Sequence, residues 1–255
     1  MAVPALKINE LLDRLRVLLD TGSRNELELR RLRQDVKRQV ELYPGDGDAH
    51  MALGIIERLE GREEEAVRHH QTALRCGWNV ERALNYAVTL DYFYRYDEAL
   101  GQAQAVIDAD PLSLTALRVA LRLAFTTGRF QLEQNLLAEY AKRVPGRLPD
   151  DLVETDMHLN LIVSTVEQLD LTDDLLAAFH RPLWDLLRTI GWGQDLKITD
   201  QVFSDGDDRF INRTLQLPLS FEDAQALNWQ WVERLAEQDQ SWPMEKMMIT
   251  LREAA

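Results

Sequence analysis

The stretch from Leu53 to Leu74 constrains the fold of this 255-residue chain more than any other. It predicts two short helices joined by a tight turn at Gly61, because glycine readily adopts the positive φ that such a turn requires. Small residues at Gly54, Ala66 and Ala73 allow the backbones of the two helices to approach closely. The stretch is therefore a predicted helical hairpin.

The position that closes this hairpin recurs along the chain at a nearly constant interval. The closing positions are 34, 33 and 34 residues apart and are occupied by Pro44, Trp78, Pro111 and Pro145. A period of this length indicates a solenoid, in which each hairpin buries its apolar face against its neighbours. We therefore expect the chain to begin with a short array of helical hairpins.

The hairpin and its period resemble the tetratricopeptide repeat (TPR), whose signature combines a leucine–glycine pair, a later alanine and a closing proline. Residues 47–80 match best, although His50, Glu57 and His70 stand where the family prefers aromatic side chains. The resemblance implies that Ala66 is buried where the two helices of its repeat meet.

Other copies of the repeat are less complete. Residues 80–113 keep the packing alanine as Ala99, whereas the next copy is degenerate because Glu133 replaces it. Residues 1–44 carry two apolar stripes of helical spacing but lack the small residues, so they are predicted to form an atypical N-terminal capping repeat. We expect three to four TPR-like repeats over residues 1–146.

Beyond the repeats, residues 147–193 predict two capping helices, the second with Thr172 as its N-cap and with Pro182 as a break or kink. Residues 194–255 hold two runs of β-branched and alternating apolar residues, then a helix that Ser220 can cap, then a third apolar run. The expected fold class is mainly α: a TPR-like helical-hairpin array, capping helices and a small C-terminal α+β (ββαβ) module. Strands are expected only after about residue 194.

The composition bounds the class of partner and the cellular compartment. Residues 147–255 hold 9 basic against 21 acidic residues, and the whole chain has a net charge of −14, which disfavours binding to nucleic acid or anionic lipid. The single cysteine, Cys76, excludes an internal disulfide and fits a reducing, cytoplasmic location. The N-terminus does not have the pattern of a signal peptide, and no apolar run is long enough to predict a membrane span.

The sequence offers little catalytic or metal-binding chemistry. His69 and His70 are adjacent, and adjacent helical residues point about 100° apart, so they cannot chelate one ion as a pair spaced by four residues would. Residues 204–208 are acidic but lack the ligand spacing of an EF-hand, and they predict a hairpin turn. The chain has no phosphate-binding glycine loop, nucleophile elbow or H-E-x-x-H helix. We therefore expect no enzymatic activity, no cofactor and no metal.

A partner-binding groove is implied by the resemblance, because the first helix of each TPR hairpin lines a concave surface. The equivalent positions here are apolar at one end and basic at the other. They do not carry the lysine and asparagine of members that clamp a C-terminal carboxylate, so a chaperone-tail clamp is disfavoured. Two arrangements are equally compatible with the sequence: an open groove, or a groove whose apolar residues are partly covered by the C-terminal module. The predicted groove comprises Met51, Ile55, Arg58, Leu59, Leu84, Val88, Asp91, Tyr92, Arg118, Arg122 and Phe125.

These features predict a non-enzymatic protein–protein interaction adaptor or chaperone that holds a segment of another protein. Two alternatives stay open, namely an acidic regulatory or immunity-type inhibitor of a basic enzyme, and the targeting subunit of an enzyme complex. Added salt should weaken binding by such an inhibitor steeply but leave binding in an apolar groove nearly unchanged. The sequence indicates neither the oligomeric state nor the partner.

Overall fold

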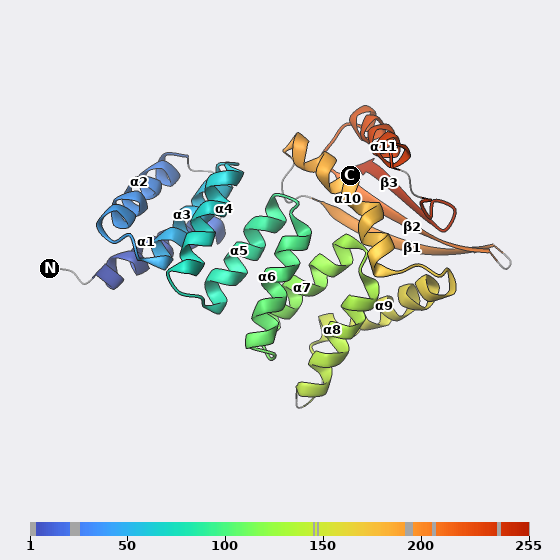
Figure 1. Cartoon of the computed structure of the whole chain (residues 1–255), viewed down its shortest axis with the longest axis horizontal. Coiled ribbons are helices and arrows are strands. Elements are labelled where there is room, and N and C mark those ends of the chain that lie inside the picture. The colour runs from blue at the N-terminus through green and yellow to red at the C-terminus, as the bar shows by residue number, and fades with distance from the viewer. Residues whose placement is uncertain are drawn as a thin grey trace. The chain divides into compact units, whose positions relative to one another are not determined.

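The computed structural model describes residues 4–20, 26–144, 146, 148–191, 196–205, 208–238 and 241–254. Consecutive helical hairpins form the first part of the chain (Figure 1). Their helices are α1 (Pro4–Asp20), α2 (Glu26–Leu42), α3 (Gly47–Leu59), α4 (Glu63–Arg75), α5 (Val80–Tyr92), α6 (Tyr96–Ala109), α7 (Leu114–Thr127) and α8 (Phe130–Arg143). The predicted closing residue Pro145 lies outside the described residues.

The remaining elements follow in the predicted order. They are α9 (Asp150–Gln168), α10 (Asp173–Ile190), β1 (Lys197–Asp205), β2 (Asp208–Leu217), α11 (Phe221–Ala236) and β3 (Met247–Glu253). Within the described ranges no strand precedes Lys197, so the expected mainly α fold with a ββαβ end is confirmed. The predicted hairpin turn falls partly outside those ranges, at residues 206–207. None of the described helices has both the length and the apolar character needed to span a bilayer.

Packing divides the chain into two compact units. Unit 1 comprises Met1–Phe93 and Asp97–Val106, and unit 2 comprises Tyr94–Tyr96 and Ile107–Ala255. The hairpin of α7 and α8 therefore belongs with the C-terminal elements. The predicted boundaries at residues 146 and 193 follow the repeat period and differ from this division.

The core of unit 1 is built by the apolar stripes of its first helices. Leu11 and Leu15 of α1 pack with Leu32 and Val36 of α2 in one buried cluster that also includes apolar residues of α3, among them Leu53. The spacing of three and four residues places each set on a single helical face. The N-terminal hairpin thus packs directly against α3.

The hairpin of α3 and α4 has the predicted close approach. A Cβ atom added at Gly54 would lie 2.5 Å from the His70 ring, so only glycine fits there, and Gly61 has the predicted positive φ of +71°. Ala66 and Ala99 are both 0% exposed, which confirms that they are buried in their repeats. The small residues therefore do set the helix spacing.

Glu57 shows how unit 1 accommodates a charge at a position where the TPR family prefers an aromatic residue. Its buried carboxylate accepts hydrogen bonds from Arg33 of α2, at 3.0 Å, and from Arg62 in the turn after α3. Burial acts to raise the pKa of Glu57, but the hydrogen bonds from Arg62 and Arg33 hold it below its ordinary value. The charge is tolerated because it is paired on both sides.

The sheet in unit 2 has the order β1-β2-β3, with β1 antiparallel and β3 parallel to β2. Residues 211–215 of the central strand are buried on both faces. Helix α11 packs on β3 through the predicted stripe of Ala224, Leu227, Trp231 and Leu235, all of which are buried. The Ser220 hydroxyl accepts from the amide of Asp223 at 3.2 Å, so the predicted N-cap is confirmed.

Helix α10 follows one prediction and contradicts another. The Thr172 hydroxyl accepts from the Leu175 amide at 3.2 Å, as an N-cap does. Of the predicted break or kink at Pro182, the break is wrong, since α10 continues to Ile190, and the kink stays a prediction. Proline removes only one backbone hydrogen bond, and the apolar face of α10 is buried on both sides of it, at Phe179 and Leu187.

Candidate functional site

The predicted groove residues at the apolar end, Met51 and Ile55, are core residues. They are 1% and 4% exposed and belong to the cluster shared with α1 and α2. Their expected exposure is therefore wrong, because the N-terminal hairpin covers this face of α3. A partner can reach neither side chain in unit 1 as it is folded here.

Two charged residues of the predicted groove are also buried in unit 1. The guanidinium carbon of Arg58 lies 5.9 Å from the centre of the Tyr92 ring, and Asp91 is near enough to act on its charge. Burial lowers the pKa of Arg58, an effect that Tyr92 and Asp91 oppose. Among the predicted residues of this unit, the accessible ones are the exposed Leu59 and the half-buried Leu84, Val88 and Tyr92.

The three predicted groove residues of unit 2 meet at one cavity. Arg118, Arg122 and Phe125 all line a cavity of about 330 Å³ between α7, α8 and α9. Because they are spaced by four and three residues, these side chains lie on one face of α7. The complete lining is Arg118, Leu121, Arg122, Phe125, Glu133, Asp151, Leu152, Thr155, His158, Leu159 and Ile162.

The cavity has an apolar interior and a polar mouth. Leu152, Leu159 and Ile162 of α9 are buried and form much of its wall. At the mouth, Arg118 and Asp151 form an exposed ion pair with a closest distance of 2.9 Å. Such surface pairs contribute at most about 1 kcal/mol, so the arginine is not tightly held.

Glu133 is the one ionisable residue of the cavity lining that is buried, with 4% of its surface exposed. Its Oε2 atom has no hydrogen-bond partner in the described part of the chain. Burial raises the pKa of Glu133 to about 8, against the attraction of Arg213, while Asp200 and Asp173 add to the rise. The Glu133 carboxyl is therefore mostly neutral near pH 7.

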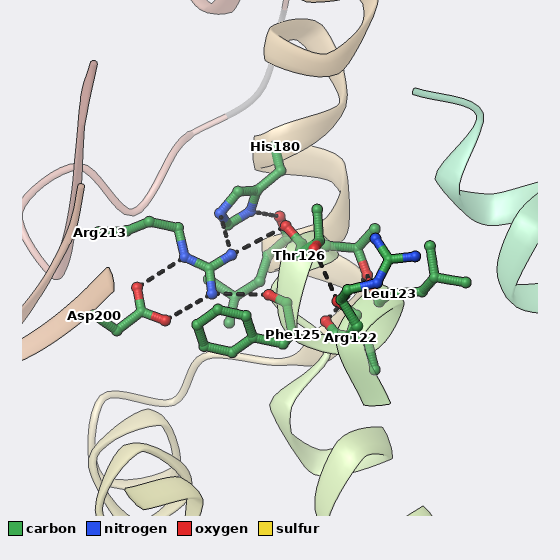
Figure 2. A network of polar contacts seen from close by, with 10 residues as sticks. Arg122, Leu123, Phe125, Thr126, His180, Asp200 and Arg213 are labelled. Atoms are coloured by element: carbon green, nitrogen blue, oxygen red, sulfur yellow. Dashed lines mark hydrogen bonds and ion pairs between the residues drawn. The ribbon is translucent and has the colours of Figure 1, made fainter. Parts of the chain in front are cut away.

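A second buried group, Arg213 of β2, lies beside the last turn of α7, next to Phe125 and Thr126 (Figure 2). It is directly opposite Asp200 in the antiparallel register of β1 and β2, so the two side chains share one face of the sheet. Arg213 Nε donates to Asp200 Oδ1 at 2.8 Å, and Nη2 donates to Oδ2 at 2.7 Å. This bidentate pair is completely buried.

The other three N–H groups of Arg213 are also used. They donate to the carbonyl oxygens of Phe125, at 2.8 Å, and Thr126, at 3.1 Å, and to His180 Nε2, at 3.2 Å (Figure 2). His180 must accept at Nε2, so it carries its proton on Nδ1, which lies 2.6 Å from the carbonyl oxygen of Leu176. Burial, with the charge of Arg213, holds the pKa of His180 well below its ordinary value.

The C-terminal elements thus hold the turn of the α7–α8 hairpin, which is the third predicted repeat after residues 47–80 and 80–113. Arg213 binds carbonyl groups of the last turn of α7, where a cation is favourable. Asp173 of α10 accepts from the amides of Gln131 and Leu132 at the start of α8. Sequence reasoning missed both contacts, and the available signal was a charged residue, Arg213, within an apolar strand.

Comparisons with known proteins leave the family open. The sequence matches neither a protein-family model nor a curated protein. Among solved structures, a Thermobaculum terrenum O-GlcNAc transferase mutant has a TM-score of 0.46 and 14% identity over 59% of this chain, which spans 30% of the transferase chain. YrrB, described as a TPR protein with an unusual peptide-binding site, has a TM-score of 0.45 and 18% identity over 61% of this chain and 79% of its own. Neither similarity bears on what this chain binds.

Proposed function

We propose that this protein is an interaction adaptor that binds a segment of another protein and has no enzymatic activity of its own. The observation that carries the proposal is the cavity in unit 2, where an apolar interior of about 330 Å³ stays unfilled by the protein's own side chains. Cavities of this kind and size commonly bind apolar groups, with a few polar atoms that fix their orientation. The same helical face holds three of the residues that the repeat pattern predicted.

The charges at the mouth define the partner further. Arg118 and Arg122 stand one helical turn apart and are both exposed. A segment that places an apolar side chain in the cavity can therefore bring a neighbouring carboxylate to these arginines. Helical and extended segments both allow this arrangement, since each presents side chains at a regular spacing.

Unit 1 also holds four predicted groove residues with accessible side chains, namely Leu59 of α3 and Leu84, Val88 and Tyr92 of α5. The groove predicted from the repeats joined these residues to Arg118 and Arg122. That joint surface stays a prediction, so the two units are best tested separately.

Photocross-linking in the native host can test the proposal. The photoreactive residue p-benzoyl-phenylalanine replaces Phe125, which lines the cavity, or Met157, an exposed apolar residue of α9 outside it. We expect a partner segment to cross-link at position 125 and not at position 157. Equal labelling at both positions would indicate non-specific contact and would contradict the proposal.

The cross-linked segment, made as a synthetic peptide, then identifies the unit that binds it. Phe125→Asp should abolish binding, because it places an unpaired charge in an apolar contact. Leu84→Asp should also weaken binding if the unit 1 surface takes part. If the peptide binds both variants with wild-type affinity, neither surface is the site.

A further inference from the structure

Glu133 occupies the repeat position that Ala66 and Ala99 hold in the preceding hairpins, 33 and 34 residues apart. In those repeats a methyl group closes the contact between the two helices. In the third repeat a carboxyl group stands there instead, 4% exposed and lining the cavity. The α7–α8 hairpin therefore has a carboxyl side chain at a helix-contact position that is alanine in the two preceding hairpins.

The surrounding protein does not provide this carboxyl with a hydrogen bond at Oε2 in the part of the chain that the structure describes. The charged groups that act on it are Arg213 and Asp200 of the sheet and Asp173 of α10. Arg213 cannot donate to it, because all five of its N–H groups already have acceptors. Water can satisfy Glu133 while the cavity is empty, but an occupant that displaces this water must supply a polar atom at the same place.

The cavity also restricts the charge of its occupant. The lining holds two carboxyl groups, and Asp151 already pairs with Arg118, so it does not offer a free negative charge to an ammonium group. Glu133 is mostly neutral and offers no full charge either. The interior therefore favours a neutral polar group, carried on an apolar body that fits walls such as Leu121 and Leu159.

We propose that the cavity binds the side chain of a tyrosine in the partner segment, with the phenol hydroxyl hydrogen-bonded to Glu133 and a neighbouring carboxylate at Arg118 and Arg122. The proposal rests on the proposed function and specifies its anchor residue. A tyrosine side chain combines a large apolar ring with a hydroxyl at its far end. That hydroxyl both donates and accepts, so it pairs with a protonated carboxyl in either sense.

Three small molecules that reproduce side chains can test this proposal on the full chain: p-cresol for tyrosine, toluene for phenylalanine and n-butylamine for lysine. Binding is followed near pH 7 through the NMR signals of ¹³C-labelled methyl groups. The methyl groups of Leu121, Leu159 and Ile162 report on the cavity, and those of Ile249 in β3 serve as the reference. We expect p-cresol to shift the cavity signals and to bind about tenfold more tightly than toluene, the size expected for one buried hydrogen bond.

Variants of Glu133 identify the group that is responsible. Glu133→Gln keeps a donor and an acceptor and should retain the preference for p-cresol, whereas Glu133→Leu should abolish it. Glu139→Gln makes the same change at an exposed position of α8 and should behave as wild type. Thermal unfolding of each variant shows that the comparison is made between folded proteins, and the wild-type comparison stands if Glu133→Leu does not fold.

Equal binding of toluene and p-cresol would overturn the tyrosine proposal, and tighter binding of n-butylamine would replace it with a cationic occupant. Cross-linking at position 125 does not depend on a hydroxyl group. A positive cross-link together with equal probe binding would therefore retain the adaptor function and reject only the tyrosine anchor.

Discussion

The second helix of a hairpin meets the first in two different ways in the two units. In unit 1, Ala66 and Ala99 are 0% exposed and leave no space between the helices. In unit 2, Glu133 stands at the same repeat position and borders a cavity of about 330 Å³. We call the contact at Ala66 and Ala99 closed and the contact at Glu133, which borders the cavity, open. The two kinds of contact differ in the residue at one equivalent position of the hairpin.

The turns between the two helices also differ between the units, in whether another part of the chain packs against them. Gly61 has a φ of +71° and no atom within 4 Å of an added Cβ, so its turn requires glycine only for the backbone conformation. Gly128 has a φ of +75°, and an added Cβ there would also lie 2.9 Å from the His180 ring. The regular repeat is stabilised by its own small residues, whereas the degenerate one is stabilised by contacts from the C-terminal elements.

The largest expected effect comes from removing that C-terminal support. Arg213→Met should lower the free energy of unfolding by about 3–5 kcal/mol, because it leaves Asp200 as an unpaired buried charge. Urea unfolding measures the loss. Arg209→Met, on the exposed part of the same strand, is the matched control and should change stability little.

The double variant Arg213→Met with Asp200→Leu sharpens this comparison. It should recover part of the lost stability, because the uncompensated charge is gone while the carbonyl groups of α7 remain without their donor. If Arg213→Met alone is as stable as wild type, the α7–α8 hairpin does not depend on the C-terminal elements for its stability. The proposed difference in how the hairpins of the two units are stabilised would then be wrong.

The open contact should also give stability an unusual pH dependence. Glu133 has its pKa raised from 4.5 to about 8 by burial, so the folded state keeps a proton that the unfolded chain releases. Stability from this group is fully present below pH 4.5 and is lost as the pH rises through about 8, at about 1.4 kcal/mol for each pH unit between these values. Glu133→Gln should therefore gain about 2 kcal/mol relative to wild type between pH 6 and pH 8, because the dependence flattens as Glu133 itself titrates near pH 8.

The comparison between wild type and Glu133→Gln isolates this titration from the histidines. Burial lowers the pKa of His70 to about 3 and that of His69 to about 4, so their stability is present above pH 6.5 and is lost as the pH falls toward those values. These opposing contributions are common to both proteins. A constant stability difference between them from pH 6 to pH 8 would show that Glu133 is ionised and solvated in the folded state.

Overpacking tests the closed contact directly. Ala66→Leu should destabilise the protein by about 1–3 kcal/mol, because a 0% exposed methyl group leaves no room for a larger side chain. Glu133→Leu introduces the same side chain at the equivalent position of the open contact and should carry no such penalty. An unchanged urea midpoint for Ala66→Leu would mean that the helix contact at Ala66 has room for a larger side chain, as the contact at Glu133 does.

The features that could be predicted from the sequence depend on nearby residues. Helical periodicity indicated the hairpins, and local capping chemistry indicated the starts of α10 and α11 at Thr172 and Ser220. The positive φ of Gly61 and the burial of Ala66 followed in the same way. The exception among local signals was the break predicted at Pro182, which does not occur because tertiary burial of α10 outweighs the loss of one hydrogen bond.

The features that could not be predicted depend on contacts between distant segments. Met51 and Ile55 have the pattern of a groove face, and they are core because they pack in one cluster with buried residues of α1 and α2. The contact of Arg213 with Phe125 joins residues 88 positions apart. The sequence marked Glu133 as an exception, but its burial beside a cavity depends on where α9 and the sheet pack.

The smallest change in stability and the sharpest change in binding are expected at Arg118. Its ion pair with Asp151 is half exposed, so Arg118→Glu should change the free energy of unfolding by less than about 1 kcal/mol. The same change places a negative charge at the mouth of the cavity and should weaken binding of the acidic cross-linked peptide. Added salt should weaken wild-type binding by screening an attraction and strengthen binding to the variant by screening a repulsion.

Arg143→Glu is a matched control on α8, because Arg143 is a similarly exposed arginine paired with Glu139 and lies outside the cavity. If both variants change affinity and salt dependence equally, the effect reflects net charge, and the open contact of unit 2 has no special role in binding.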